Sequence, residues 1–129
     1  MKNESMTVDG LLSQAMALMG EQEKDRRGYT PFTAGILNTL MADCFSVNNA
    51  LRERAGKELL AEIPKVTLLT DVVPFEYEAM VNLLPYGLAF YLLMQDDEND
   101  KANIFSASYE ANKMKIAQAQ YERTEDWYR

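Results

Sequence analysis

Apolar residues recur at steps of three and four in four stretches of the chain, and that spacing predicts amphipathic helices. In the first stretch the periodic residues extend from Val8 to Met19. Thr7 stands directly before them at an N-cap position, and Gly20 follows them, where glycine commonly ends a helix. The first predicted helix is therefore bounded at both ends by its own signals.

A second predicted helix begins with Thr30 as the N-cap and Pro31 at the first helical position. Apolar residues keep the helical period from there to Phe45. The preceding residues 21–29 are highly charged and predict a solvated loop. Residues 46–49 include two adjacent asparagines, which weaken a helix, and we expect them to end or turn this one.

The third predicted helix, residues 75–95, carries apolar residues on both sides and is therefore expected to be the central one. Pro85 lies inside it and is expected to kink it, because proline removes a backbone hydrogen bond. Residues 101–121 predict a fourth helix. The residues that define its period are Ile104, Ala107, Ala111, Met114, Gln118 and Tyr121.

Residues 46–74 are the hardest to assign. Residues 51–63 could form one amphipathic helix, but Gly56 interrupts it and Pro64 closes it. Residues 65–74 are rich in β-branched side chains and favour an extended conformation. No second strand is evident, so this segment is expected either to lie along the helices or to add to a neighbouring subunit.

Together these patterns predict an all-α fold: a bundle of about four helices with a central helix kinked at Pro85 and an extended arm between the second and third helices. Residues 1–121 are expected to form a single helical domain, within which residues 46–74 are the irregular or extended arm. Residues 122–129 are assigned to a C-terminal tail. The length of 129 residues fits one domain.

The amino-acid composition and charge exclude or disfavour several classes of function. Apolar residues make up 47% and charged residues 26%, as in soluble globular proteins. The chain has one cysteine and no histidine, which excludes Ser–His–Asp and Cys–His relays and every zinc site that uses histidine. A net charge of −7 disfavours general nucleic-acid binding. The longest apolar stretch, residues 83–94, is shorter than the roughly 20 residues that span a membrane. With no signal peptide at residues 1–10, the protein is expected to stay in a cytoplasm.

No catalytic, cofactor-binding or metal-binding residue is predicted. Residues 96–100, DDEND, contain consecutive acids and no glycine, so they indicate a solvated turn with a helix cap rather than a calcium loop. Cys44 lies on the apolar stripe of the second helix and is expected to be a buried, inert thiol. Glu58 and Glu62 have the spacing of a carboxylate pair, but such pairs are common on solvated helices.

The extended segment and the tail are the candidate contacts with another chain. Trp and Tyr dominate binding energy at interfaces, so an aromatic pair at a terminus either clamps its own core or anchors a partner. The candidate interface residues are Val66, Leu68, Leu69, Val72, Val73, Trp127 and Tyr128.

Two motifs carry a resemblance to a known family. LPYGLA at residues 84–89 is followed by the acidic turn and then by Ala102, Phe105, Tyr109 and Glu110 in the next helix. This arrangement resembles small all-helical tailed-phage head–tail connector (adaptor) proteins. The first two predicted helices also look like those of that family, so the resemblance touches residues 7–45 and 75–121.

The resemblance implies a non-enzymatic structural adaptor of a phage or prophage particle, which joins portal or capsid to tail as part of a ring. Its partners would be further copies of itself and the portal and tail-completion proteins, and its location the virion and, during assembly, the host bacterial cytoplasm. DNA would pass through the lumen without specific binding, and acidic walls would let it slide. No membrane or cofactor is implied. The alternative is a monomeric helical binding module, such as an assembly chaperone or a small regulator that grips a partner helix.

Overall fold

The computed structural model describes residues 6–126 of the chain, with side chains through residue 119. Within this range six α-helices dominate, and they confirm the predicted all-α class. The helices are α1 (Val8–Met19), α2 (Thr30–Asp43), α3 (Phe45–Arg54), α4 (Tyr77–Asn82), α5 (Leu84–Gln95) and α6 (Asn99–Asp126). A 3-10 helix, η1 (Glu23–Gly28), and two short strands, β1 (Met6–Thr7) and β2 (Val72–Val73), complete the fold.

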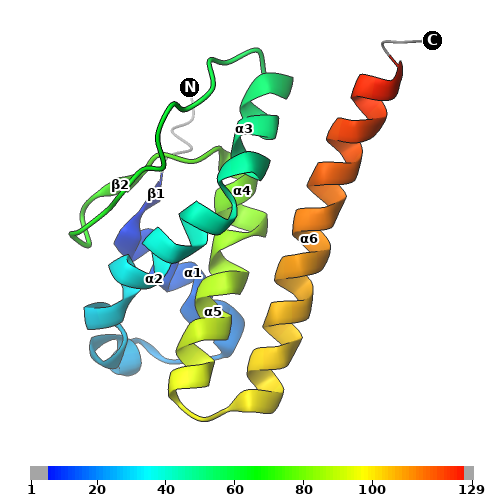
Figure 1. Ribbon diagram of the computed structural model, residues 1–129. Coiled ribbons are helices and arrows are strands. Elements are labelled where there is room, and N and C mark those ends of the chain that lie inside the picture. The colour runs from blue at the N-terminus through cyan, green and yellow to red at the C-terminus, as the bar shows by residue number, and fades with distance from the viewer. Residues whose placement is uncertain (1–5, 127–129) are drawn as a thin grey trace.

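Helix α5 is the centre of the bundle, as its apolar residues on both sides predicted. It packs against α6, α1 and α2, and Figure 1 shows α6 running antiparallel beside it after a short turn at the base. Large aliphatic side chains from three helices meet around it with no exposed surface. They are Leu11, Leu12, Leu37, Met41, Leu84, Leu88, Leu92 and Leu93.

The signals that bound α1 are confirmed. The Thr7 hydroxyl oxygen accepts a hydrogen bond from the Gly10 amide at 3.0 Å, as an N-cap does. Gly20 ends the helix with a φ of 75°, a left-handed conformation that glycine adopts without steric cost. At α2 the boundary differs by one residue, since Tyr29 is the N-cap and Thr30 is already helical. The charged segment before it forms η1 rather than an irregular loop.

The predicted third helix is broken rather than kinked. Helix α4 ends at Asn82, Leu83 is not helical, and α5 starts at Leu84. Pro85 lies in the first turn of α5, where its missing N–H costs nothing. Because Pro85 cannot donate to the turn before it, the chain separates into two helices at this point.

The arm was predicted to comprise residues 46–74, and its predicted start is wrong. Residues 46–54 continue as α3, because Asn48 is fully buried and its side-chain oxygen accepts from the Glu76 amide at 2.7 Å instead of competing with the helix. Gly56, with a φ of 74°, follows this helix. Residues 57–71 form neither helix nor strand.

The extended segment does find a second strand. Strands β1 and β2 pair antiparallel, with Met6 opposite Val73 and Thr7 opposite Val72. Two residues are too few for an alternating pattern to stand out in the sequence. The segment therefore lies along its own chain, which is one of the two arrangements expected for it.

Helix α6 differs from the prediction in length and in orientation. It starts at Asn99 and continues to Asp126, inside the residues assigned to the tail. The periodic residues that predicted it point outward, since Ile104, Ala107, Ala111, Met114 and Gln118 are all exposed; the Tyr121 side chain lies outside the described residues. The face that packs on the bundle consists of Ala102, Phe105, Tyr109 and Ile116. Both rows have helical spacing, so periodicity alone does not choose between them.

Candidate interaction surfaces

Side-chain amides fix the arm to the helices. The Asn38 amide nitrogen donates to the Val66 carbonyl and its oxygen accepts from the Val66 N–H, both at 2.8 Å. Asn49 makes the same pair of bonds to Leu60, at 3.2 and 2.9 Å. Each asparagine side chain bonds to both the backbone N–H and the carbonyl of one arm residue, as a neighbouring strand would. Residues 60–66 are therefore held along α2 and α3.

The end of the arm also completes the start of α1. The Val8 amide donates to the Asp71 carbonyl and the Asp9 amide to the Leu69 carbonyl, both at 2.9 Å. These amides belong to the first turn of α1, and N–H groups in a first turn have no hydrogen-bond acceptor within their own helix. The Asp71 carboxylate in turn accepts from the Thr67 and Leu68 amides, and those bonds lower its pKa. The arm and α1 are thus one hydrogen-bonded unit.

The candidate interface residues of the arm separate into three groups. Val66 and Val73 are buried in the protein's own core, at 3% and 1% exposure, so their assignment to an interface is corrected. Leu69 is half-buried against that core. Leu68 and Val72 are more than half exposed and remain available. Trp127 and Tyr128 lie outside the described residues.

Two further aliphatic side chains join Leu68 and Val72 on the outside of the arm. Leu59 is 51% and Ile63 is 50% exposed, although neither was singled out in the sequence. We call Leu59, Ile63, Leu68 and Val72 the arm face. Exposed apolar side chains mark interaction sites where they form a contiguous patch.

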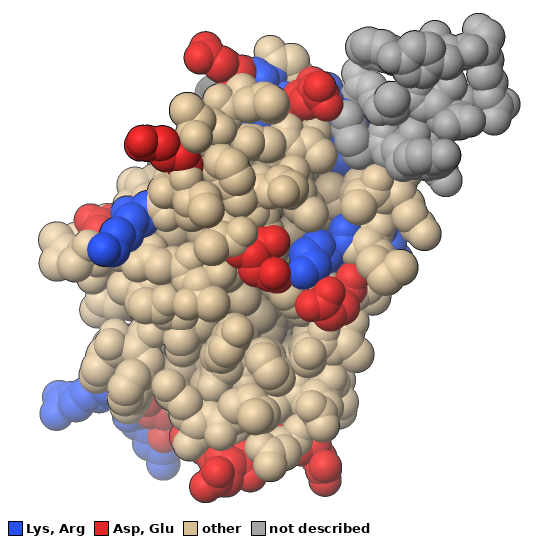
Figure 2. Space-filling model, in the orientation of Figure 1, with Lys and Arg blue, Asp and Glu red and all other residues tan. Residues whose placement is uncertain are grey.

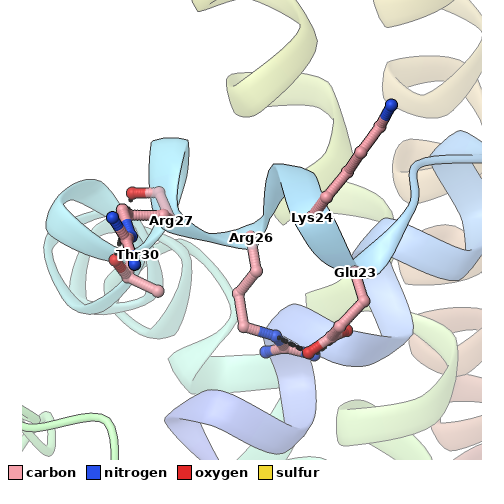
Figure 3. A pocket seen from close by; sticks show the side chains of 5 residues that line it. All are labelled: Glu23, Lys24, Arg26, Arg27 and Thr30. Atoms are coloured by element: carbon pink, nitrogen blue, oxygen red, sulfur yellow. Dashed lines mark hydrogen bonds and ion pairs between the residues drawn. The ribbon is translucent and has the colours of Figure 1, made fainter.

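Arg26, in the charged segment before α2, is paired with acids of its own chain. Arg26 donates to Glu23 at 2.6 Å, to Asp9 at 2.7 Å and to the Ser13 hydroxyl at 2.6 Å. The hydrogen bond from Arg26 lowers the pKa of the Glu23 carboxyl. A shallow hollow of about 540 Å³ lies here, and Figure 3 shows Lys24 pointing away from the Arg26–Glu23 pair. The arrangement ties η1 to α1 and does not gather cations around one point.

A polar network joins α2 to α6 beside the core. Tyr109 donates to the Asp43 carboxylate at 2.6 Å, and Lys113 donates to the same oxygen at 2.7 Å. The ammonium of Lys113 also lies 4.9 Å from the centre of the Tyr109 ring, a cation–π contact. Cys44 Sγ is 2.8 Å from the Tyr109 oxygen, and since the tyrosine proton goes to Asp43, the thiol is the donor.

The predicted burial of Cys44 is confirmed. The residue has no exposed surface, and burial raises the pKa of its thiol to about 11. Burial likewise raises the pKa of Tyr109, with the bond to Asp43 adding to the effect. A thiol that stays protonated near neutral pH is a poor nucleophile, so Cys44 takes part in this network as a hydrogen-bond donor.

A hollow of about 240 Å³ opens between α2, α5 and α6 above this network. Its lining residues include Thr39, Asp43, Phe90, Tyr91 and Glu110. Figure 2 shows an area over α2 and α5 with few charged side chains, bordered by acidic ones at its base and by acidic and basic ones on its α6 side. This weakly charged area is a second surface suited to contact with a partner.

Among the described residues, no group of three or more His, Cys, Asp or Glu side chains is placed to hold a metal ion. No helix in the described part of the chain is long and apolar enough to cross a membrane.

The fold and its surfaces define a helical-bundle protein with a hydrogen-bonded arm that carries four exposed apolar side chains. No protein-family model matches the chain, and no curated protein or solved structure matches it either.

Proposed function

We propose that the protein is a non-enzymatic structural adaptor of a phage or prophage particle, which joins portal or capsid to tail as part of a ring. The resemblance of LPYGLA and the helix after it to head–tail connectors supports this role. The observation that carries the proposal is the arm face, an apolar surface held in place by the paired hydrogen bonds of Asn38 and Asn49.

A ring needs two different surfaces on each copy, because each subunit contacts one neighbour on either side. The arm face supplies one apolar surface, and the weakly charged area over α2 and α5 in Figure 2 supplies a second of different shape. Since the arm is hydrogen-bonded to the bundle, little conformational freedom would be lost on docking.

The polar groups near the core support a structural role over an enzymatic one. Cys44, Tyr109 and Asp43 satisfy one another, and Lys113 neutralises the carboxylate. No group among them is both exposed and activated as a nucleophile or base needs to be.

The test is the solution mass of the full chain by light scattering, alone and mixed with a purified portal protein from the same genome. We expect a discrete multi-subunit ring, either alone or on the portal. The variant with Leu59→Ser and Leu68→Ser should lose assembly while keeping its helical spectrum. Thr67→Ser with Thr70→Ser, also exposed arm positions, is the matched control and should assemble normally.

A wild-type chain that stays monomeric and ignores the portal would overturn the adaptor role and favour the monomeric binding module. Assembly that survives the two leucine substitutions would remove the arm face from the interface. In the same assay, Trp127→Ala with Tyr128→Ala tests the tail residues of the sequence-based hypothesis.

A further inference from the structure

The outer side of α6 carries a stripe of four apolar residues and one glutamine with coiled-coil spacing. We define the outer stripe as Ile104, Ala107, Ala111, Met114 and Gln118, all of which are exposed. Within the described part of the chain Ile104, at 64%, is the most exposed large apolar side chain, and Met114 follows at 60% together with Leu68. Steps of three, four, three and four residues match the a and d positions of a heptad repeat. At a rise of 1.5 Å per residue, the stripe is about 21 Å long.

The bundle leaves this stripe without a partner. Helix α6 packs on α5 and α3 through its opposite face, which includes Phe105, Tyr109 and Ile116. Figure 1 shows α6 at the edge of the bundle, with the other helices on one side of it. A helix that is apolar on two faces is typical of one that is covered on both.

Two charged side chains beside the outer stripe indicate which surface would pair with it. Glu110 and Lys115 are exposed, lie on either side of the stripe and are five residues apart. In a parallel, in-register pair of helices, this is the spacing of a g position and the e position that it faces on the partner. Each Glu110 would therefore meet Lys115 of the other copy, twice by symmetry.

One antiparallel alignment is disfavoured by the same residues, the one that sets Ala107 against Ala111 of the other copy. In that alignment two g positions face each other, so Glu110 would lie against Glu110. Like charges across a helix pair repel, whereas the small side chains at the centre of the stripe permit close approach in the parallel pair.

We propose that the outer stripe of α6 pairs in parallel and in register with the outer stripe of a second copy of this chain. The contact is separate from the proposed ring, because a two-fold pair uses one face on both copies and closes on itself. The stripe is short, and interfaces below about 1,200 Å² are typical of weak complexes, so the pair forms only at high protein concentration.

Sedimentation equilibrium of the full chain over a range of concentrations tests this pairing. In the variant with Leu59→Ser and Leu68→Ser, which lacks the proposed ring contact, the mass should rise from monomer to dimer. Ala111→Glu places charges inside the pair and should raise the dissociation constant about tenfold or more. Ala42→Glu, at an exposed helical alanine of α2, is the matched control and should leave the dissociation constant unchanged.

Two further measurements test the register. Lys115→Glu should weaken the pair, and Glu110→Lys added to it should restore the wild-type dissociation constant. Ala111→Cys should form a disulfide-linked dimer under mild oxidation, because only a parallel, in-register pair brings position 111 against itself. A chain with Leu59→Ser and Leu68→Ser that is monomeric at all concentrations would overturn the proposal, as would equal effects of Ala111→Glu and Ala42→Glu. Loss of portal assembly with the dimer intact would instead count against the proposed function alone.

Discussion

Gly87 is the point of closest approach among three helices, and replacing it tests the packing of the bundle. A Cβ atom at this position would lie 2.5 Å from Leu40 Cδ2 on α2 and 3.2 Å from Tyr109 Cδ1 on α6. Leu40 and Tyr109 are both buried, and Tyr109 is also held by its bonds to Asp43 and Cys44. Both side chains would have to shift to admit the new methyl group, so Gly87→Ala overpacks the contact.

Two opposing terms set the size of the effect. Alanine is favoured over glycine inside a helix by roughly 0.5–1 kcal/mol. Overpacking a core costs typically about 1–3 kcal/mol. Gly87→Ala is therefore expected to lower the free energy of unfolding by up to about 2.5 kcal/mol, the difference between these terms.

Gly35→Ala isolates the packing term. Gly35 lies in α2, is exposed, and has no atom within 4 Å of a Cβ built on it. It gains the helical preference without the clash, so this variant should be more stable than wild type by roughly 0.5–1 kcal/mol. Urea denaturation followed by circular dichroism measures both. If Gly87→Ala proves as stable as Gly35→Ala, the close packing of α5 against α2 and α6 is refuted.

Three other predictions follow from individual contacts. Asn38→Ala removes both hydrogen bonds to Val66 and should lower the free energy of unfolding by about 1–3 kcal/mol. Hydrogen exchange at the Val66 amide should accelerate, and unchanged protection of that amide would show that Asn38 does not hold the arm. Lys113 and Tyr109 lower the pKa of Asp43 below its ordinary 3.8, so its carboxylate stabilises the fold above that value and the contribution is lost as pH falls further. Asp43→Asn should accordingly flatten the decline of stability measured by urea titrations at acidic pH, and an identical decline would count against it. Burial raises the thiol pKa of Cys44 to about 11, so Ellman's reagent should react slowly with the native protein and quickly in urea; equal rates would show that the thiol is accessible.

Local signals account for the parts of the fold that could be predicted. The cap residues Thr7 and Gly20 act within one turn of the helix that they bound, so the limits of α1 follow from the sequence. The double-sided apolar pattern of residues 83–94 likewise indicates a helix surrounded by others. Pro85 marks a discontinuity, although only the structure distinguishes a break from a kink.

Contacts between residues far apart in the sequence account for the parts of the fold that could not be predicted. Asn48 in isolation weakens a helix, but its bond to the Glu76 amide, 28 residues away, removes that competition. Asn38 and Asn49 carry no signal of the arm residues that they bind. On α6 two rows share the same spacing, and Tyr109 decides between them through its bonds to α2. Asparagine and tyrosine side chains inside the predicted helices could have been marked as candidates for long-range hydrogen bonds. The sequence does not indicate which residues they bind.

The way the arm is held also limits how it could take part in assembly. Detaching it would break four bonds from Asn38 and Asn49, at about 1 kcal/mol each. It would also expose Val66 and Val73, each at about 1.5–3 kcal/mol. The resulting cost of roughly 7–10 kcal/mol approaches the whole stability of a typical domain. Exchange of the arm with a neighbouring subunit is therefore disfavoured, and any contact through it would use the arm face as it stands. The apolar arm residues that a partner could reach without unfolding the chain are then Leu59, Ile63, Leu68 and Val72. The assembly variant replaces two of them, Leu59 and Leu68.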